Sequence, residues 1–406
     1  MRAVISVLTN PAQITSTTAV EPTAFSAYNA GTTYGFGALI SVAADFSNYE
    51  SLAAGNLAHT PNISPLWWRK IGPTETAWAD ATVYAVGATS YSTTAHHNYE
   101  CLTAHTSDIA TGKVLPVLPE TENTYWIDVG ATNKYAAFDL DRNKQTVYAS
   151  PHVWVITPGE RVNSICLQSM SANTLTIKVT STAQGGTIYP LAYDETKTYT
   201  KNECMTVGLT DCYQSKADDN LGHSAPDATW WTAVSGYVFD LNTRQVFNAT
   251  DYCYNPFSTR PSLSLFDNPP VTDAVITITL AATAGNVKCG AIGAGLYIYM
   301  GTLLKPARNE GKGFSTIDRD AWGNATLVKR RMLPVMKGPV LLDSWRIDSL
   351  LAARSVLDAV PAFYVGVEED GDWTDMFSII GVHQQFDLET NNATDKATLL
   401  FEAEGI

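Results

Sequence analysis

Three pairs of adjacent aromatic residues are the part of this sequence best suited to binding chemistry. They are Trp67-Trp68, Tyr125-Trp126 and Trp230-Trp231. A sugar ring carries an apolar face of C–H bonds, and a flat aromatic side chain offers that face a matching surface. Polar side chains around such a platform fix the orientation of the hydroxyl groups. The pairs therefore predict weak contacts with carbohydrate.

The two members of each pair are expected to have different roles. A module of about 45 residues has little core, so its tryptophans are needed to hold it together. We expect the second member of each pair to be buried and the first to be the candidate platform. The candidate glycan-binding residues are therefore Trp67, Tyr125 and Trp230, together with Tyr49, Tyr99 and Tyr213 from the start of each repeat. The candidate side chains for binding hydroxyl groups are Glu50, Asn56, Glu100, Asp128, Gln214 and Asn220.

Each aromatic pair closes an internal repeat. A copy begins with Tyr and then Glu or Gln, continues through a variable loop that contains proline, and ends with the aromatic pair. The two ends are constant while the loop length varies, which is typical of a small module with a fixed core. The first two copies predict tandem modules over residues 20–75 and 76–133. The third copy, at about 193–236, falls between strands of a later domain and predicts an insertion.

The rest of the sequence favours β-structure. In 174–180 (TLTIKVT) and 274–280 (AVITITL), large apolar residues alternate with polar ones, as in a strand with one buried face. One segment, 344–360, has helical spacing, with Ser344 as its expected N-cap. We therefore predict a mainly β fold. It comprises an N-terminal arm over 1–19, the tandem small β modules, a β-sandwich over 134–299 with the third module inserted, and a C-terminal β domain over 300–406 with helix 344–360.

Composition excludes several classes of partner. The 26 basic and 40 acidic residues give a net charge of −14, which repels phosphates, so we expect no nucleic-acid partner. The longest apolar stretch, 291–304, is short and broken by three glycines, so we expect no membrane insertion. Six cysteines without CxxC spacing form neither a disulfide scaffold nor a zinc site. The N-terminus lacks a secretory apolar segment, so the chain is expected in the cytoplasm, or outside it only within a particle.

Signatures of catalysis and metal binding are weak. The sequence has no GxSxG, P-loop, HExxH or GxGxxG motif. The carboxylates within 368–372 fit glycoside hydrolysis, but an acidic surface turn explains them as well. Asp139 and Asp141 alternate as calcium ligands would, and a turn is the simpler explanation. The metal-ligand types His96, His97, Cys101 and His105 are interpreted as ordinary residues of a strand and loop. We expect no enzyme activity, no metal site and no cofactor.

The second module resembles a known family. Its Ala77-Trp78, Tyr84, Gly87, Tyr91, Tyr99-Glu100 and Trp126 look like the small chitin-binding type of carbohydrate-binding module. The chain departs from that pattern at Ala88, where such modules often carry Asp, and in a long loop before Trp126. The following run 130–139 (GATNKYAAFD) is similar to the turn that leads from such a module into a β-sandwich in a group of bacteriophage and prophage tail proteins. Segments 273–280, 287–291, 318–330 and 400–406 resemble the same group.

This resemblance covers roughly residues 75–400 and implies a virion tail component without catalysis. The C-terminal pattern of strands around one helix also looks like the tail-tube and distal-tail domains that assemble into rings. The basic run Lys329-Arg330-Arg331 is then either a solvated strand edge or a contact with an acidic neighbouring subunit.

Three functional hypotheses follow. The first is a structural component of a bacteriophage tail, at the distal tail, baseplate or tail tip. It would assemble in the host cytoplasm into a virion, as a homo-oligomeric ring or sleeve among other tail proteins. Its modules would touch host cell-surface polysaccharide, with avidity from many copies. The alternative is a non-catalytic polysaccharide-binding accessory protein of a glycan-degrading system. A third hypothesis keeps the tail location, with modules that stabilise subunit contacts and bind no sugar.

Overall fold

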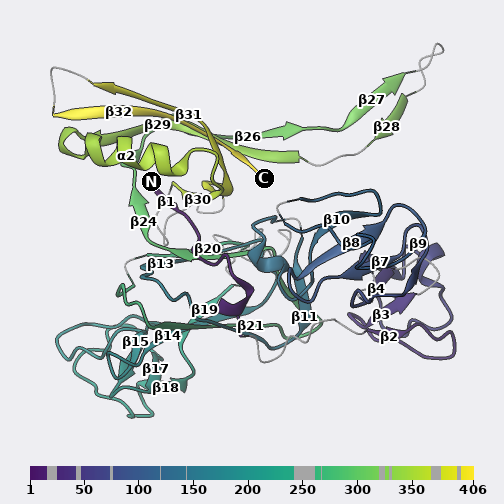
Figure 1. Cartoon of the computed structure of the whole chain (residues 1–406). Coiled ribbons are helices and arrows are strands. Elements are labelled where there is room, and N and C mark those ends of the chain that lie inside the picture. Colours follow the sequence, from purple (N-terminus) through teal and green to yellow (C-terminus); the bar gives the residue numbers. More distant parts are fainter. Residues whose placement is uncertain are drawn as a thin grey trace.

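The computed structural model describes twelve stretches of the chain. They are residues 1–15, 25–42, 47–73, 76–118, 120–142, 144–241, 261–266, 268–319, 325–328, 332–366, 376–390 and 395–406. The mainly β fold class predicted from the sequence is confirmed, with small modules, a β-sandwich and a C-terminal sheet that carries one helix in the described part (Figure 1). One of the six cysteines, Cys253, lies outside the described residues, as do the basic run Lys329–Arg331 and the carboxylates within 368–372.

The β-sandwich forms because alternate residues of its strands are large and apolar. Its larger sheet has the order β12-β21-β14-β15, with β19 also paired to β14, and the facing sheet has the order β20-β13-β23. Every second residue of β14 and β21 is buried, and Ile177 and Ile278 share one core with Leu167 of the facing sheet. The strands are β11 (Thr146–Ala149), β12 (His152–Ile156), β13 (Ser164–Gln168), β14 (Thr174–Ser181), β15 (Gly186–Tyr189), β19 (Tyr237–Asp240), β20 (Leu263–Leu265), β21 (Ala274–Ala281), β22 (Asn286–Cys289) and β23 (Ala291–Gly295).

Each of the three modules is built on a three-stranded antiparallel meander. Module 1 has β3 (Leu39–Val42), β4 (Ser47–Ser51) and β5 (Trp68–Pro73), with β2 (Ser26–Ala27) beside β3 and the turn η3 (Pro61–Ile63). Module 2 has β7 (Thr89–Tyr91), β8 (His97–Cys101) and β10 (Trp126–Ala131), with β6 (Val83–Tyr84) paired to β9 (His105–Thr106). Module 3 has β16 (Cys204–Val207), β17 (Asp211–Ser215) and β18 (Trp231–Val234), and it lies between β15 and β19 of the sandwich.

The C-terminal sheet has the order β24-β1-β30-β31-β32-β29-β25, and β26 also pairs with β29. In β32, every second residue is buried, and Leu399 and Phe401 pack with Leu350 and Leu357 of helix α2. The elements are β1 (Arg2–Val4), β24 (Tyr297–Tyr299), β25 (Thr302–Leu303), β26 (Arg308–Gly313), β29 (Met332–Asp343), α2 (Ile347–Leu357), β30 (Ala362–Val365), β31 (Ser378–Thr390) and β32 (Lys396–Gly405). No helix of the described residues is long and apolar enough to cross a membrane.

The N-terminal segment is part of both large domains, whereas the sequence predicted a separate arm over 1–19. Strand β1 pairs with β24 on one side and with β30 on the other. The chain then runs along the sandwich through the turn η1 (Pro11–Gln13), and Leu8 and Ile14 are buried in the sandwich core. Strand β24, which falls within the range 134–299 predicted for the sandwich, belongs to the C-terminal sheet. A strand of three residues is too short to show a periodic pattern.

The helix differs from its predicted range of 344–360. Residues 344–346 form the 3-10 turn η5 (Ser344–Arg346), so Ser344 is not the N-cap, and the α-helix begins at Ile347. The helix ends at Leu357 because Asp358 has extended backbone angles and Ala359 has a φ of +56°. Pro361 also disfavours helical angles at the residue before it.

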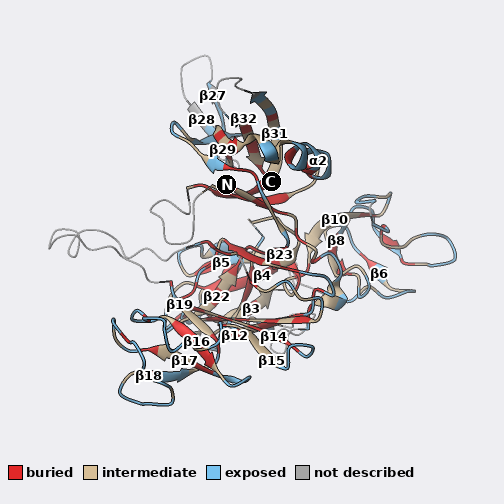
Figure 2. Cartoon of the chain, turned by 90° about the vertical axis from the view of Figure 1, so that its left-hand side faces the viewer, coloured by how far each residue is buried: buried red, intermediate tan, exposed pale blue. Residues whose placement is uncertain are grey.

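A protruding arm extends the C-terminal sheet. We define the arm as residues 308–337, in which β26 pairs with the first half of β29 and the hairpin β27 (Thr316–Arg319) and β28 (Ala325–Val328) forms the tip. The tip reaches away from the other domains in Figure 1, and every residue of β26 is exposed. Figure 2 shows exposed surface on the described part of this hairpin. Among the described residues of the arm, the exposed large apolar side chains are Phe314, Ile317, Leu327, Val328 and Met332.

The sandwich and the C-terminal sheet meet through a small apolar cluster. It contains Val4, Phe363 and Ile380 from the C-terminal sheet and Cys166 and Ala291 from the sandwich. Strand β23 allows this close approach because it carries glycine at 293. A Cβ added there would lie 2.2 Å from a ring carbon of Phe363. The domain interface therefore depends on the absence of a side chain at this position.

We expect Gly293→Ala to lower the free energy of unfolding by about 1–3 kcal/mol, because the added carbon forces the Phe363 ring to move. Urea unfolding followed by tryptophan fluorescence measures the change. Gly313→Ala in the arm is the control, since a Cβ there meets no atom within 4 Å. The additional change Phe363→Leu should recover part of the lost stability. Equal stability of the Gly293 and Gly313 variants would contradict this account of the interface.

Candidate functional site

The same pair of rings holds each module together. The closing tryptophans Trp68, Trp126 and Trp231 are buried, as the sequence predicted. A tyrosine ring meets each of them edge to face, with centroids 5.1 Å apart for Tyr34 and Trp68, 4.8 Å for Tyr84 and Trp126, and 5.2 Å for Tyr199 and Trp231. Each of these tyrosine hydroxyls also accepts a hydrogen bond from the backbone N–H five residues before it, at 2.7–2.9 Å. The modules therefore share one core built from aromatic residues.

Burial divides the six candidate glycan-binding residues into two groups. Tyr49 and Tyr99 are buried in the module cores, so neither can meet a sugar, and their proposed role as surface platforms is wrong. These positions on the central strand face the closing tryptophan, which explains their burial. The other four residues, Trp67, Tyr125, Tyr213 and Trp230, are half-buried and remain accessible.

Modules 1 and 3 each present a stacked histidine–tryptophan pair. The rings of His59 and Trp67 are 3.9 Å apart and inclined by 12°, and those of His223 and Trp230 are 3.9 Å apart and inclined by 11°. Each histidine is fixed by the neighbouring core, because its backbone oxygen accepts a hydrogen bond of 2.7 Å from Nε1 of Trp68 or Trp231. The two modules thus hold the same flat aromatic unit at a partly exposed position.

Module 2 has a different arrangement at the corresponding place. The ring of Tyr125 is tilted by 45° against His105, with 4.7 Å between centroids. His105 is buried, and its Nδ1 lies 3.6 Å from Sγ of Cys101 and 2.7 Å from the backbone oxygen of Thr103. Burial raises the pKa of the Cys101 thiol above its ordinary value. Module 2, whose sequence resembles the chitin-binding modules, therefore lacks the flat stacked histidine–tryptophan pair of modules 1 and 3.

Several polar side chains that were candidates for binding sugar hydroxyl groups form hydrogen bonds within the protein instead. Asn56 and Asn220 are buried, and Nδ2 of each donates a hydrogen bond of 3.0 Å to the hydroxyl of Ser51 or Ser215. Asp128 accepts a hydrogen bond of 2.7 Å from the backbone N–H of Gly130 and lies 2.8 Å from Nδ1 of His97. The side-chain nitrogen of Gln214 donates a hydrogen bond of 3.1 Å to the backbone oxygen of Asn202. Glu100 is exposed.

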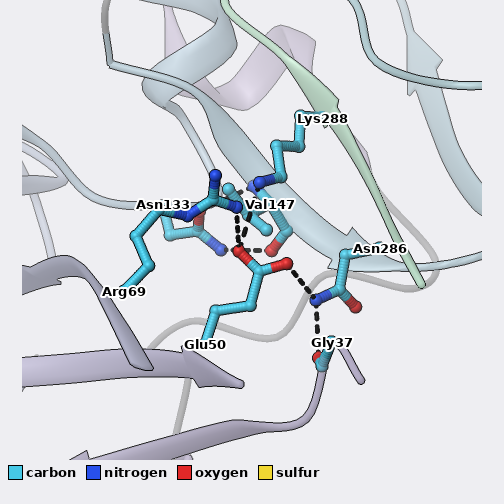
Figure 3. Close-up of polar contacts among 7 residues, drawn as sticks. All are labelled: Gly37, Glu50, Arg69, Asn133, Val147, Asn286 and Lys288. Atoms are coloured by element: carbon cyan, nitrogen blue, oxygen red, sulfur yellow. Dashed lines mark hydrogen bonds and ion pairs between the residues drawn. The ribbon is translucent and has the colours of Figure 1, made fainter. Parts of the chain in front are cut away.

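Glu50 joins module 1 to the sandwich (Figure 3). Its buried carboxylate is paired with Arg69 of the same module and lies 3.1 Å from Nζ of Lys288 on strand β22. Nδ2 of Asn286 on the same strand donates a hydrogen bond of 2.8 Å to the backbone oxygen of Gly37. Gly37 has a φ of +77°, and a Cβ there would lie 3.2 Å from the Cα of Gly285. The first module is therefore docked against the sandwich by charge and by backbone contact.

The charge on Glu50 is stabilised by this docking. Burial raises the pKa of its carboxyl, but the hydrogen bond from Arg69 and the charge of Lys288 outweigh burial, so the pKa lies below its ordinary value. The charged form of Glu50 is thus favoured in the folded protein.

Metal-ligating side chains do not converge in the part of the chain that the structure describes. No group of three His, Cys, Asp or Glu side chains there could hold a metal ion. The five cysteines in that part are buried and unpaired with one another. Asp139 closes a turn by accepting a hydrogen bond of 2.8 Å from the backbone N–H of Asp141.

Two kinds of site residue were missed by sequence reasoning. The core tyrosines Tyr34 and Tyr199 lie outside the repeat as it was defined, although both precede the Tyr-Glu or Tyr-Gln pair by a similar distance. The histidines His59 and His223 stand nine and eight residues before the closing tryptophan of their modules. That recurrence in the first and third copies is a signal that could have found them.

We expect Glu50→Gln to destabilise the docked first module by about 1–3 kcal/mol, because it leaves Lys288 and Arg69 without their counter-charge. Glu100→Gln is the matched control, since Glu100 occupies the same repeat position in module 2 and is exposed. Urea unfolding of both variants measures the difference. Equal loss of stability in the two variants would show that the Glu50 contacts contribute nothing specific.

The contribution of Glu50 should also depend on pH. Because its pKa is lower in the folded protein than the ordinary value of 4.5, its stabilisation is complete above about pH 4.5 and is lost as the pH falls through the folded value. Thermal unfolding between pH 3 and pH 7 should therefore separate wild type from Glu50→Gln at neutral pH. The two curves should converge in acid. A constant difference across the range would contradict this assignment.

Comparison with protein families and curated proteins identifies no relative of the chain. No protein-family model matches the chain, and no curated protein matches it. The function therefore has to be inferred from the residues and geometry of the chain itself. Three features carry that inference: the paired aromatic surfaces of modules 1 and 3, the docking of module 1, and the exposed arm.

Proposed function

We propose that this protein is a structural component of a bacteriophage tail. In this proposal the sandwich and the C-terminal sheet form a scaffold that packs against sister chains in a ring or sleeve and against other tail proteins. The modules bind host cell-surface polysaccharide weakly, and repetition around the assembly multiplies those contacts. The protein performs no catalysis.

The observation that carries the proposal is the difference in net charge between the arm and the remainder of the chain. The arm has seven Lys and Arg against three Asp and Glu, a net charge of +4. The other residues have 19 Lys and Arg against 37 Asp and Glu, a net charge of −18. Opposite charges on two parts of one chain favour contact between copies and disfavour contact between like parts. A second copy is thus the partner best matched to the arm.

Apolar surface on the arm supports the same partner. Ile317 and Leu327 face each other across the hairpin and are 62% and 72% exposed. Burial of a side chain of this size contributes about 1.5–3 kcal/mol. A projecting hairpin with such residues at its tip is typical of an element that is covered in an assembly.

The glycan-binding part of the proposal is supported by the recurrence of the stacked pair. Modules 1 and 3 differ in most loop residues, yet both orient a histidine ring flat against a partly exposed tryptophan. The second tryptophan of each pair is buried in the module core, whereas the first packs against that core and stays partly exposed. A rigid aromatic surface that is left partly exposed favours a role in binding.

A second role for module 1 has its own support. The docking of Glu50 and Gly37 onto the sandwich favours a contribution of this module to the rigidity of the scaffold. In that case modules 1 and 3 would brace subunit contacts without binding sugar. The two roles make opposite predictions for glycan retention, which the experiment on the tryptophans separates.

We expect the full chain to form oligomers at micromolar concentration, and Ile317→Asp with Leu327→Asp to dissociate them, because the substitutions place charge in the contact. Sedimentation velocity measures the species present. Val117→Asp is the control, since Val117 is 76% exposed and lies in module 2. An unchanged oligomer in the arm variant, or a wild-type chain that is monomeric throughout, would count against the proposal.

We expect Trp67→Ala with Trp230→Ala to lower retention of the full chain on chitin or peptidoglycan by about tenfold or more, which corresponds to 1.4 kcal/mol or more of lost stacking. Trp68 and Trp231 remain in the cores, but Trp67 and Trp230 also pack against them, so circular dichroism must first show that the variant is folded. Trp345→Ala is the matched control, since Trp345 is 74% exposed and lies outside the modules. Equal retention of all three proteins would favour the bracing role.

A further inference from the structure

A small cavity lies where module 2, the sandwich and the N-terminal segment meet. Its volume is about 280 Å³. Residues 8–11 and Ile14 of the N-terminal segment form one wall, and the turn 94–97 of module 2 forms another. Tyr135, Phe138 and Asp139, from the turn that leads into the sandwich, complete the lining. The cavity is therefore composite, and three parts of the chain must come together to form it.

The cavity contains a carboxylic acid but no basic side chain of Lys or Arg. Asp139 directly follows the 3-10 turn η4 (Ala136–Phe138) and accepts a hydrogen bond from the backbone N–H of Asp141, which fixes its orientation. Among the described residues, Asp139 forms no ion pair. His97 also lines the cavity, and its Nδ1 is engaged by Asp128 at 2.8 Å. An anion would find no Lys or Arg side chain in this lining.

The rest of the lining is aromatic and aliphatic. The rings of His96 and Tyr135 are 4.3 Å apart, and Phe138 lies beside them in the lining. Leu8, Ile14 and Leu118 supply aliphatic surface. A volume below the usual 300–1,000 Å³ of drug-sized sites fits a ligand with a single ring or a short chain.

We propose that this cavity binds a small organic ammonium ion, with Asp139 as its counter-ion and the aromatic rings around its apolar body. A carboxylate in partly apolar surroundings gains from a cation that pairs with it. Aromatic faces attract the same cation. A neutral apolar ligand of the same shape would leave the carboxylate without a counter-ion. This inference is independent of the proposed function.

The ionisation of Asp139 agrees with this assignment. Burial raises the pKa of its carboxyl to about 7, although the hydrogen bond from Asp141 and the charges of Lys144 and His97 act in the opposite direction. The negative charge of Asp141 adds to the rise. A bound cation favours the ionised form, so binding should release protons near pH 7.

The test is a calorimetric titration of the full chain at pH 8 with cyclohexylamine, which is protonated, and with cyclohexanol, a neutral molecule of similar shape. We expect the amine to bind at least about tenfold more tightly than the alcohol. Asp139→Asn should remove that preference, because asparagine keeps the turn but loses the charge. Asp141→Asn, on the same turn but outside the lining, should keep the preference.

The dependence on pH gives a second measurement. Between pH 6 and pH 8 the affinity for the amine should rise about tenfold as Asp139 ionises. Protonation of His96 or His97 would add positive charge and act in the same direction, while Asp128, Asp141, Lys144 and Tyr135 are the other ionisable groups around the cavity. Asp139→Asn should therefore remove most of the rise.

A third measurement does not depend on any variant. Titrations at pH 7 in two buffers with different heats of ionisation should show release of about half a proton per amine bound, because Asp139 is then about half ionised. Equal affinity for the amine and the alcohol would overturn the proposal. So would an unchanged preference in Asp139→Asn.

Discussion

A buried tryptophan packed edge-on against a tyrosine is the interaction on which all three modules depend. The Tyr–Trp contacts have nearly the same geometry in each, and each tyrosine hydroxyl is fixed by a backbone N–H. A module of three short strands cannot bury enough aliphatic surface to be stable without further core residues. The tyrosine and tryptophan rings supply that core. Because this core is formed by a few aromatic residues at fixed places, the loop before the closing tryptophan is free to differ in length.

The aromatic core also explains what lies at the module surface. The neighbour of each closing tryptophan lies one residue before the strand and packs against the core with part of its ring exposed. In modules 1 and 3 that neighbour is a tryptophan, and the loop places a histidine flat against it. Module 1 then uses a charge, Glu50, to dock onto the sandwich, so its aromatic surface is held rigidly with respect to the scaffold. A rigid surface loses less conformational entropy when it binds.

The N-terminal segment connects the sandwich to the C-terminal sheet. Strand β1 lies between β24 and β30, and the residues after it enter the sandwich core. Sandwich and C-terminal sheet are thus tied by a strand as well as by the cluster around Phe363. The arm projects from these two domains, and the large apolar side chains of its described tip, Ile317 and Leu327, are exposed. In the proposed function this exposed tip contacts a second copy of the chain.

Sequence patterns determined much of this fold but only part of the site. Alternation in β14 and β21 predicted the sandwich, and the size of the modules correctly predicted burial of the closing tryptophans. The contact between Glu50 and Lys288 joins residues 238 positions apart, and no local pattern encodes it. Burial of Tyr49 and Tyr99 likewise depends on which face of the central strand meets the tryptophan. Strand β1 is too short for periodicity, and the cavity beside Asp139 exists only because three segments meet.

The most direct test of the central claim, that a rigid scaffold assembles through the arm and carries the modules as passive binding surfaces, is electron microscopy of the purified full chain. The account predicts closed rings or stacked sleeves in which the arm of one subunit lies against an acidic surface of the next and the modules face outward. Isolated particles of one chain, with the arm uncovered at concentrations where tail proteins assemble, would contradict it.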